Sequence, residues 1–284
     1  MKFGASTFIW VSPFSDDTLD LFHKVQHMGF DMLEICVESP ETINVHSIAA
    51  ASAMTGIGII ICGVFGAGRD ISSVDPAVRT AGVEYLKTCV DIAAGVGAEV
   101  VSGPMYSATG KTNLLSPEEK TAQWNFAVEN MKIVAEYAKQ KDIKLAVEPL
   151  NRFETDFINT VEQGMELLER IGFDNVGLLL DTFHMNIEEE NIRDAICKAG
   201  DRLFSFHACA NDRGTPGRDH IDWVPIKRAF RKIGYDKYMV IEAFNTDITE
   251  IARAVSLWRE PVDPPDLLAI KGLKFLKRVF QFRK

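Results

Sequence analysis

The sequence has no apolar run long enough to cross a membrane, because no window stays apolar for the ~18 residues that a spanning helix requires. Its first residues, MKFGASTFIW, carry a single lysine and too short an apolar run to form a signal peptide. The five cysteines are an odd number without a short repeated spacing, which argues against a disulfide framework. These absences predict a cytoplasmic protein with reduced thiols and no membrane partner.

Basic charge is also in short supply. The chain has 31 lysines and arginines against 40 aspartates and glutamates, a formal net charge of −9. Binding to a phosphate backbone requires clustered basic residues, so we do not expect a nucleic-acid partner. No G-x-G-x-x-G motif follows the first apolar segment, and the nearest glycine cluster, GVFGAG at 63–68, follows the third. This argues against an open, doubly wound sheet that binds a dinucleotide.

What the sequence does have is a regular alternation of short apolar runs with longer amphipathic segments, the pattern of βα units around a parallel sheet. No linker or low-complexity segment interrupts it. Eight such units in a chain of this length predict an α/β protein with a single (β/α)8 TIM barrel domain over residues 1–284, since ~250 residues is typical of that fold. The expected strands are 2–10, 31–37, 57–65, 98–105, 143–149, 175–181, 202–208 and 237–243.

The helix ends are marked as clearly as the strands. Asp75-Pro76 and Ser116-Pro117 each place a capping residue before a proline at the first helical position, and Thr160 with Gln163 forms a capping box. Glycines stand where helices should stop, shortly before the next expected strand. These are Gly29, Gly56, Gly97, Gly172 and Gly234.

Four of the expected strands end in an ionisable residue. Glu148, Asp181, His207 and Glu242 end strands five to eight, and in a parallel barrel all four ends lie on the catalytic face. Each has an ordinary explanation: a helix cap for Asp181, a core histidine for His207, and solvated loop acids for the two glutamates. Together, three carboxylates and an imidazole on adjacent strands would repel one another and lose hydration unless a cation lay between them. The pattern therefore predicts a divalent metal site.

Three carboxylates and one imidazole suit Mn²⁺, Co²⁺ or Mg²⁺ better than a thiolate-rich structural zinc site. A six-coordinate ion with four protein ligands keeps two positions for a substrate that chelates through a hydroxyl and a carbonyl. Such an ion would stabilise an enediolate and make the proton next to the carbonyl removable. With Glu148 and Glu242 on opposite faces of that carbon, one would remove a proton and the other return one. The expected reaction is epimerisation.

Three longer stretches give this reaction a family. AVEPLNRFETDFINT (146–160), LLLDTFHMNIEEENIRDAICKAG (178–200) and FHACANDRGTPGRDHIDW (206–223) resemble the ketose 3-epimerases that act on D-tagatose and D-psicose (D-allulose), over essentially the whole chain. The resemblance implies a carbohydrate isomerase whose metal, usually Mn²⁺ or Co²⁺, is held by Glu148, Asp181, His207 and Glu242, with the two glutamates as acid and base. It further implies that Glu154, His184 and Arg213 bind the first three substrate carbons. The implied partners are a small sugar and further copies of the chain, in a dimer or tetramer.

The chain departs from this family in two places. After the metal-ligand histidine it has Cys209-Ala-Asn-Asp212 where many members have a glutamate, and Tyr106-Ser-Ala-Thr follows the fourth strand where a bulkier aromatic is expected. Phe8, Trp10 and Phe14 are candidates for the wall around the distal end of the sugar, with core packing as the alternative. For the acidic run 188–190 we expect a solvated first turn of a helix.

Other reactions on the same barrel remain open. An aldose–ketose isomerase, or a 3-oxo-sugar lyase or deglycosidase, would share the metal and the base but differ in the leaving group or the carbon that is reprotonated. A non-catalytic sugar-binding barrel is the other alternative, although it would not need two opposed glutamates. The expected substrates of the epimerase are free ketoses of the D-tagatose, D-psicose and L-ribulose type.

Overall fold

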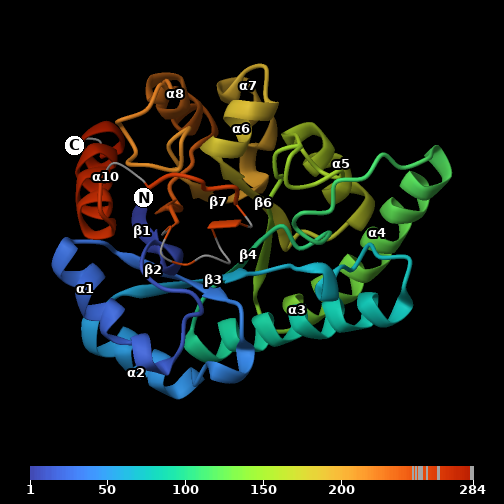
Figure 1. The fold of residues 1–284 in the computed structure, drawn as a ribbon, viewed down its shortest axis with the longest axis horizontal. Helices are drawn as coiled ribbons and strands as arrows, with labels where there is room; N and C mark the ends of the chain where they lie inside the picture. Colours follow the sequence, from blue (N-terminus) through green and yellow to red (C-terminus); the bar gives the residue numbers. More distant parts are fainter. Residues whose placement is uncertain (245, 247, 249–251, 254, 261–262, 282–284) are drawn as a thin grey trace.

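The computed structural model describes residues 1–281 except 245, 247, 249–251, 254 and 261–262. Eight parallel strands close into a barrel in sequence order, with β8 paired to β1 at Phe3 and Met239. Helices surround the barrel, and α10 packs against α8 and β8 (Figure 1). The predicted TIM barrel is confirmed. The strands are β1 Lys2–Ser6, β2 Met32–Val37, β3 Gly58–Gly63, β4 Val100–Gly103, β5 Lys144–Val147, β6 Val176–Asp181, β7 Leu203–His207 and β8 Tyr238–Ile241.

The helices begin and end at the residues that the sequence marked. The side chains of Asp75, Ser116 and Thr160 accept hydrogen bonds from the first turns of their helices, and Ser116 and Thr160 complete capping boxes. All five predicted glycines follow the last helical residue with positive φ, between 67° and 88°. The helices are α1 Asp20–Met28, α2 Val45–Thr55, α3 Pro76–Val96, α4 Pro117–Lys139, α5 Val161–Ile171, α6 Thr182–Glu188, α7 Ile192–Ala199, α8 Trp223–Ile233 and α10 Pro265–Phe280.

The first strand is shorter than predicted. It ends at Ser6, and the chain turns into a 3₁₀ helix, Thr7–Ile9, whose residues remain buried. Thr7 explains the change, because its hydroxyl accepts a hydrogen bond from the backbone of Cys36 on β2 and so takes the place of a strand partner. This turn brings Phe8 to the mouth of the barrel.

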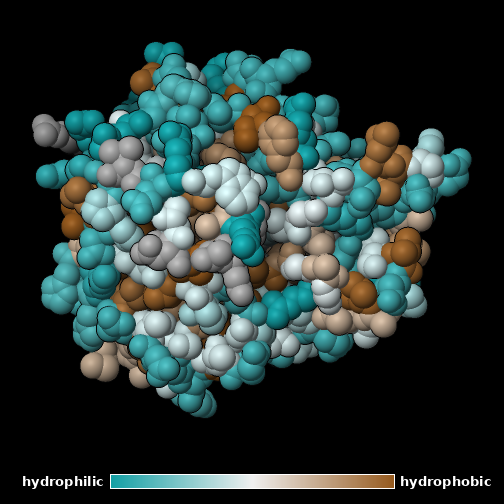
Figure 2. Space-filling view, in the orientation of Figure 1, coloured by the Kyte–Doolittle hydropathy of each residue, from teal (hydrophilic) through white to brown (hydrophobic). Residues whose placement is uncertain are grey.

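The barrel interior is layered. Two small apolar clusters fill its lower part, one built from Met32, Ile60 and Val240 and the other including Leu179 and Phe204. Polar side chains replace them at the carboxyl ends of the strands. Hydrophilic residues cover much of the face shown in Figure 2. Among the described residues, no helix combines the length and hydropathy that a membrane crossing needs.

Candidate active site

The carboxyl ends of β5 to β8 bring the four predicted metal ligands to one point. Asp181 and His207 are the last residues of β6 and β7, and Glu148 and Glu242 directly follow β5 and β8. All four are at most 6% exposed. The Nδ1 atom of His207 lies 3.8 Å from Oε1 of Glu148 and 3.6 Å from Oε1 of Glu242. The convergence expected from the strand ends is therefore present in the structure.

Asp181 caps a helix with one carboxylate oxygen and has its second oxygen in the barrel mouth. Its Oδ1 accepts a hydrogen bond from the backbone N–H of Phe183 and caps α6. Its Oδ2 lies 2.9 Å from Nη1 of Arg213 and 3.2 Å from Sγ of Cys209, which donates to it. A capping aspartate thus directs its second oxygen into the barrel mouth.

The two nitrogens of His207 have different surroundings. Nε2 lies 3.0 Å from Oε2 of Glu34, a glutamate in the middle of β2. Nδ1 is buried, has no hydrogen-bond partner, and faces Glu148 and Glu242. Burial disfavours the charged imidazole, but Glu34 and Glu242 outweigh it and raise the pKa of His207 well above its usual value. Sequence reasoning missed Glu34, although an acid inside the apolar run DMLEICV was a visible signal.

Arg213 supplies a fixed positive charge at this point. Its guanidinium donates from Nη1 to Asp181 and, at 2.7 Å, to Glu242, and its central carbon lies 3.9 Å from the ring centroid of Phe183 and 4.9 Å from that of Phe244. The residue has φ of 60°, a conformation that costs energy for a residue with a side chain. The turn that follows β7 thus places this side chain in the barrel mouth by means of a strained backbone conformation.

His184 and Glu154 lie on the other side of Arg213. The backbone N–H of Asn151 donates to Nδ1 of His184, and Nε2 lies 3.3 Å from Nη2 of Arg213 and 3.9 Å from Oε1 of Glu148. Burial lowers the pKa of His184 to about 3, which keeps the ring neutral. Asn151 also donates from Nδ2 to Oε1 of Glu154, whose pKa is raised by burial. Asn151, which sequence reasoning missed, therefore orients both side chains.

The expectation of a solvated first helical turn at 188–190 was wrong, because Glu188 is the last residue of α6 and α7 begins only at Ile192. Glu188 ends α6 and its side chain is only 5% exposed. It accepts hydrogen bonds from the backbone N–H and both ends of the guanidinium of Arg152, and Glu189 accepts from the backbone N–H of Val161. These acids fasten the loop that carries Glu154, a long-range contact that no helix-end pattern reveals.

The donor atoms at the mouth fit a divalent cation. Ligand atoms of Glu148, Asp181 and His207 lie within 4.8 Å of one another, and Glu242 forms such groups with Glu34 and His207 and with Asp181 and Cys209. Burial raises the pKa of Glu148 well above its usual value, His207 opposes that shift, and Glu242 and Asp181 add to it. The buried Nδ1 of His207 has no hydrogen-bond partner and faces two carboxylates, an arrangement that suits a shared cation. A cation here would balance charges that Arg213 balances only in part.

Comparison with known proteins agrees with this geometry. Residues 22–279 match the family of xylose isomerase-like TIM barrels. A probable ketose 3-epimerase from Synechocystis sp. is 35% identical over 99% of this chain and 97% of its own length. The chain belongs to the ketose 3-epimerase family. This confirms the predicted resemblance and the prediction of an isomerase.

Two further relatives mark the range of this family. The crystal structure of a D-psicose 3-epimerase with D-tagatose from Clostridium cellulolyticum H10 superposes with a TM-score of 0.91, at 29% identity over 99% of each chain. A more distant relative, the 3-dehydro-D-guloside 4-epimerase of Escherichia coli, is 26% identical over 81% of this chain and 88% of its own length. The relatives of this chain thus include an epimerase named for a different carbon of the sugar, C4.

The cavity of this family member extends from the acidic cluster to an apolar wall. It has a volume of about 250 Å³. Glu148, Glu154, His184, Arg213 and Glu242 line one side of it. The other lining residues are mainly apolar, and Thr109 is the polar exception: Phe8, Cys62, Gly63, Val64, Phe65, Gly66, Pro104, Thr109, Gly110, Leu150, Phe244 and Val255.

Of the aromatics named from the sequence, Phe8 lines the cavity, whereas the ring of Phe14 is buried in the core. Trp10 does not line the cavity, and its indole N–H donates to Asp266 on α10. Tyr106 is fully buried and donates to the carbonyl of Ile158. It belongs to the packing of the barrel and not to the sugar-facing wall.

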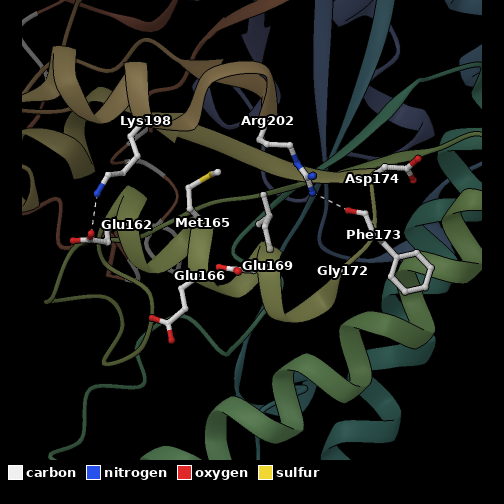
Figure 3. A pocket seen from close by; sticks show the side chains of 10 residues that line it. Glu162, Met165, Glu166, Glu169, Gly172, Phe173, Asp174, Lys198 and Arg202 are labelled. Carbon is white, nitrogen blue, oxygen red and sulfur yellow. Dashed lines mark hydrogen bonds and ion pairs between the residues drawn. The ribbon is translucent and has the colours of Figure 1, made fainter.

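A larger groove of about 880 Å³ lies away from the strand ends, along α5. Figure 3 shows two pairs among its lining residues: Lys198 with Glu162, and Arg202 with the carbonyl of Phe173. None of the predicted site residues lines it. In this ketose 3-epimerase family member the smaller cavity at the barrel mouth is therefore the candidate active site.

Proposed function

We propose that the chain catalyses the C3 epimerisation of free ketoses. The observation that carries the proposal is a pair of buried carboxylates, Glu148 and Glu242, that line the same cavity. An oxygen of each lies within 3.8 Å of Nδ1 of His207. One carboxylate can serve each face of a carbon held between them. The ketose 3-epimerases among the relatives support the same reaction.

The proposed reaction transfers a proton in two steps. An ionised glutamate takes the C3 proton, and the electron pair of the C3–H bond moves to the C2 carbonyl oxygen to give an enediolate. The other glutamate, protonated, gives its proton to the opposite face of C3, and the C2 carbonyl forms again. Burial raises the pKa of Glu148, which suits a group that must hold a proton near neutral pH.

Glu148, Asp181, His207 and Glu242 would hold the cation, with Mn²⁺ as the first candidate and Co²⁺ or Mg²⁺ as alternatives. When bound, it would supply Lewis-acid polarisation of the carbonyl. The chain's own groups orient the sugar: Arg213 donates through its guanidinium to hydroxyls at the C1 to C3 end, His184 forms a hydrogen bond to one through Nε2, and Glu154 accepts from one.

We propose unphosphorylated substrates because the charged groups near the mouth are already paired. Arg213 is held by Asp181 and Glu242, and Arg218 forms an ion pair with Asp263 at 3.1 Å. A phosphate would have to break one of these pairs. A cytoplasmic homo-oligomer, dimer or tetramer, remains part of this proposal on the strength of the family alone.

The deciding experiment is deuterium exchange in D₂O, followed by NMR, with D-fructose, D-psicose, D-tagatose and L-ribulose. Deuterium at C3 together with the C3 epimer supports the proposal. The 26% identical 4-epimerase of a 3-dehydro-sugar gives a second candidate, C4 epimerisation of a 3-oxo-sugar. Exchange at C4 of a 3-oxo-glycoside, with none at C3 of any free ketose, would favour that candidate instead.

A further inference from the structure

Glu34 is a buried carboxylate that the proposed proton transfers do not use. It is 0% exposed, and its Oε2 lies 3.0 Å from Nε2 of His207 and accepts a hydrogen bond from the hydroxyl of Ser102 at 3.4 Å. Its Oε1 has no hydrogen-bond partner. Glu34 comes from β2, Ser102 from β4 and His207 from β7, so the side chains meet inside the barrel.

Burying a carboxylate in this position costs free energy of folding. Removing it from water costs several kcal/mol unless it is paired, and only one of its two oxygens has partners. Its neighbours on β2 are apolar: Leu33 and Ile35 are completely buried in the hydrophobic core. An apolar residue at position 34 would avoid this desolvation cost. The carboxylate therefore points to a role in its contact with His207.

The orientation of the His207 ring indicates this role. With Nε2–H donating to Glu34, Nδ1 points toward Glu148 and Glu242, where it has no protein partner. A ring turned by half a revolution would place a C–H where Nδ1 now lies. Carboxylates that hold the second nitrogen of a metal-binding histidine fix its tautomer and orientation and make it a better ligand.

We propose that Glu34 is a positioning residue, which holds the His207 ring with Nδ1 directed at the cation position and adds negative charge behind it. This rests on the proposed function, which places a cation there. Ser102 holds the Glu34 carboxylate from the other side, at the longer distance of 3.4 Å.

The first test is cation affinity, measured by calorimetry on metal-stripped protein with Mn²⁺ and Co²⁺. Glu34→Gln keeps an oxygen acceptor and loses the charge, and should weaken binding about tenfold. Glu34→Leu loses both and should weaken it about a hundredfold. The control is Cys36→Ser, on the same strand, whose side chain contacts Ser6 and not His207. Its affinity should stay within about twofold of wild type.

A purely structural role would give a different pattern. Thermal unfolding of the same variants would then show lowered stability, while the affinity of the folded protein for Mn²⁺ stayed at the wild-type value. That result would overturn the proposal. The graded order, wild type above Glu34→Gln above Glu34→Leu, is what a hydrogen bond combined with a charge requires.

The second test does not need a metal. In metal-free protein labelled with ¹⁵N-histidine, His207 should show a slowly exchanging Nε2–H signal, assigned by its loss in His207→Asn and absent from Glu34→Leu. If wild type binds no cation but this signal is present and depends on Glu34, the proposed function fails and the positioning stands. If wild type binds Mn²⁺ and Glu34→Leu changes neither signal nor affinity, the positioning fails and the proposed function stands.

Discussion

The cavity has two walls of opposite character. On the side of β5 to β8, ionisable groups are buried at high cost, and Arg213, Asp181, Asn151 and Glu34 each hold a neighbour in a fixed orientation. The other wall is apolar and includes Phe8, which follows β1, and Phe244, which follows β8, with ring centroids 5.5 Å apart. Hydrogen bonds fix the first wall, whereas the second is fixed by packing and shape.

The two walls should differ in how strongly they discriminate between substrates. A site that hydrogen-bonds hydroxyls strongly rejects analogues that lack them, because its own polar groups then lose their partners. An apolar wall discriminates by only about 1–3 kcal/mol per methylene-sized change. We therefore expect strict requirements at the end of the sugar held by Arg213 and His184, and tolerance at the end held by Phe8.

The largest effect should come from removing the cation that the polar wall would hold. Chelation should abolish turnover, because the buried carboxylates then repel one another and the carbonyl is no longer polarised. Adding Mn²⁺ or Co²⁺ should restore it. Steady-state assays on dialysed protein, with elemental analysis, would check this. Full activity without a divalent ion, or stoichiometric zinc on cysteines, would contradict it.

The next largest effect should follow Glu148→Gln and Glu242→Gln. Each removes a negative donor and a proton-transfer group while keeping the size of the side chain. We expect kcat to fall by about 10³-fold or more, roughly 4 kcal/mol in the barrier. The control is Glu162→Gln, which breaks a surface ion pair with Lys198 along α5. Activity within about tenfold of wild type, ~1.4 kcal/mol, in either glutamate variant would refute the two-base assignment.

Much of the barrel and its mouth could be predicted because the signals are local. Prolines and capping residues mark helix starts, glycines mark helix ends, and a charged residue directly after an apolar run marks a strand end. The same position in eight repeated units then places Asp181 and His207 together without any knowledge of contacts.

The residues that were missed act across the barrel. Glu34 meets His207 over 173 positions, and Glu188 meets Arg152 over 36. Tyr106 stands after β4, where the family resemblance led us to expect a bulky aromatic of the sugar-facing wall, but its hydroxyl reaches Ile158 and its ring lies in the core. Which way a side chain faces in a loop depends on partners that a local pattern does not contain.

A smaller effect is expected for Glu154→Gln, which changes the polar wall outside the acid–base pair. Loss of a hydrogen bond to a charged acceptor costs about 1.5–3 kcal/mol, so kcat/KM should fall about 10- to 150-fold. Kinetics on a ketose and its 1-deoxy analogue would test the cause. The wild type should prefer the ketose strongly, and the variant should prefer it less; an unchanged preference would separate Glu154 from the C1 end.

The smallest effect should come from the apolar wall. Phe8→Leu shortens a side chain that makes no hydrogen bond to the sugar in the proposed orientation, so kcat/KM should change by about tenfold or less for each of D-fructose, D-psicose, D-tagatose and L-ribulose, while their order can change. The control is Trp10→Phe, which lies outside the cavity and should leave the order as it is.

Comparing the same substrates with a ketose phosphate would sharpen the contrast between the walls. In the proposed orientation the phosphate would lie at the apolar end, beside Phe8, Val64 and Phe65, where the guanidinium of Arg69 already donates to the carbonyls of Val64 and Glu38. The phosphate ester should therefore be the poorest substrate in wild type and in Phe8→Leu alike. A strong preference for it would mean that the sugar lies the other way round, with Arg213 at its phosphorylated end.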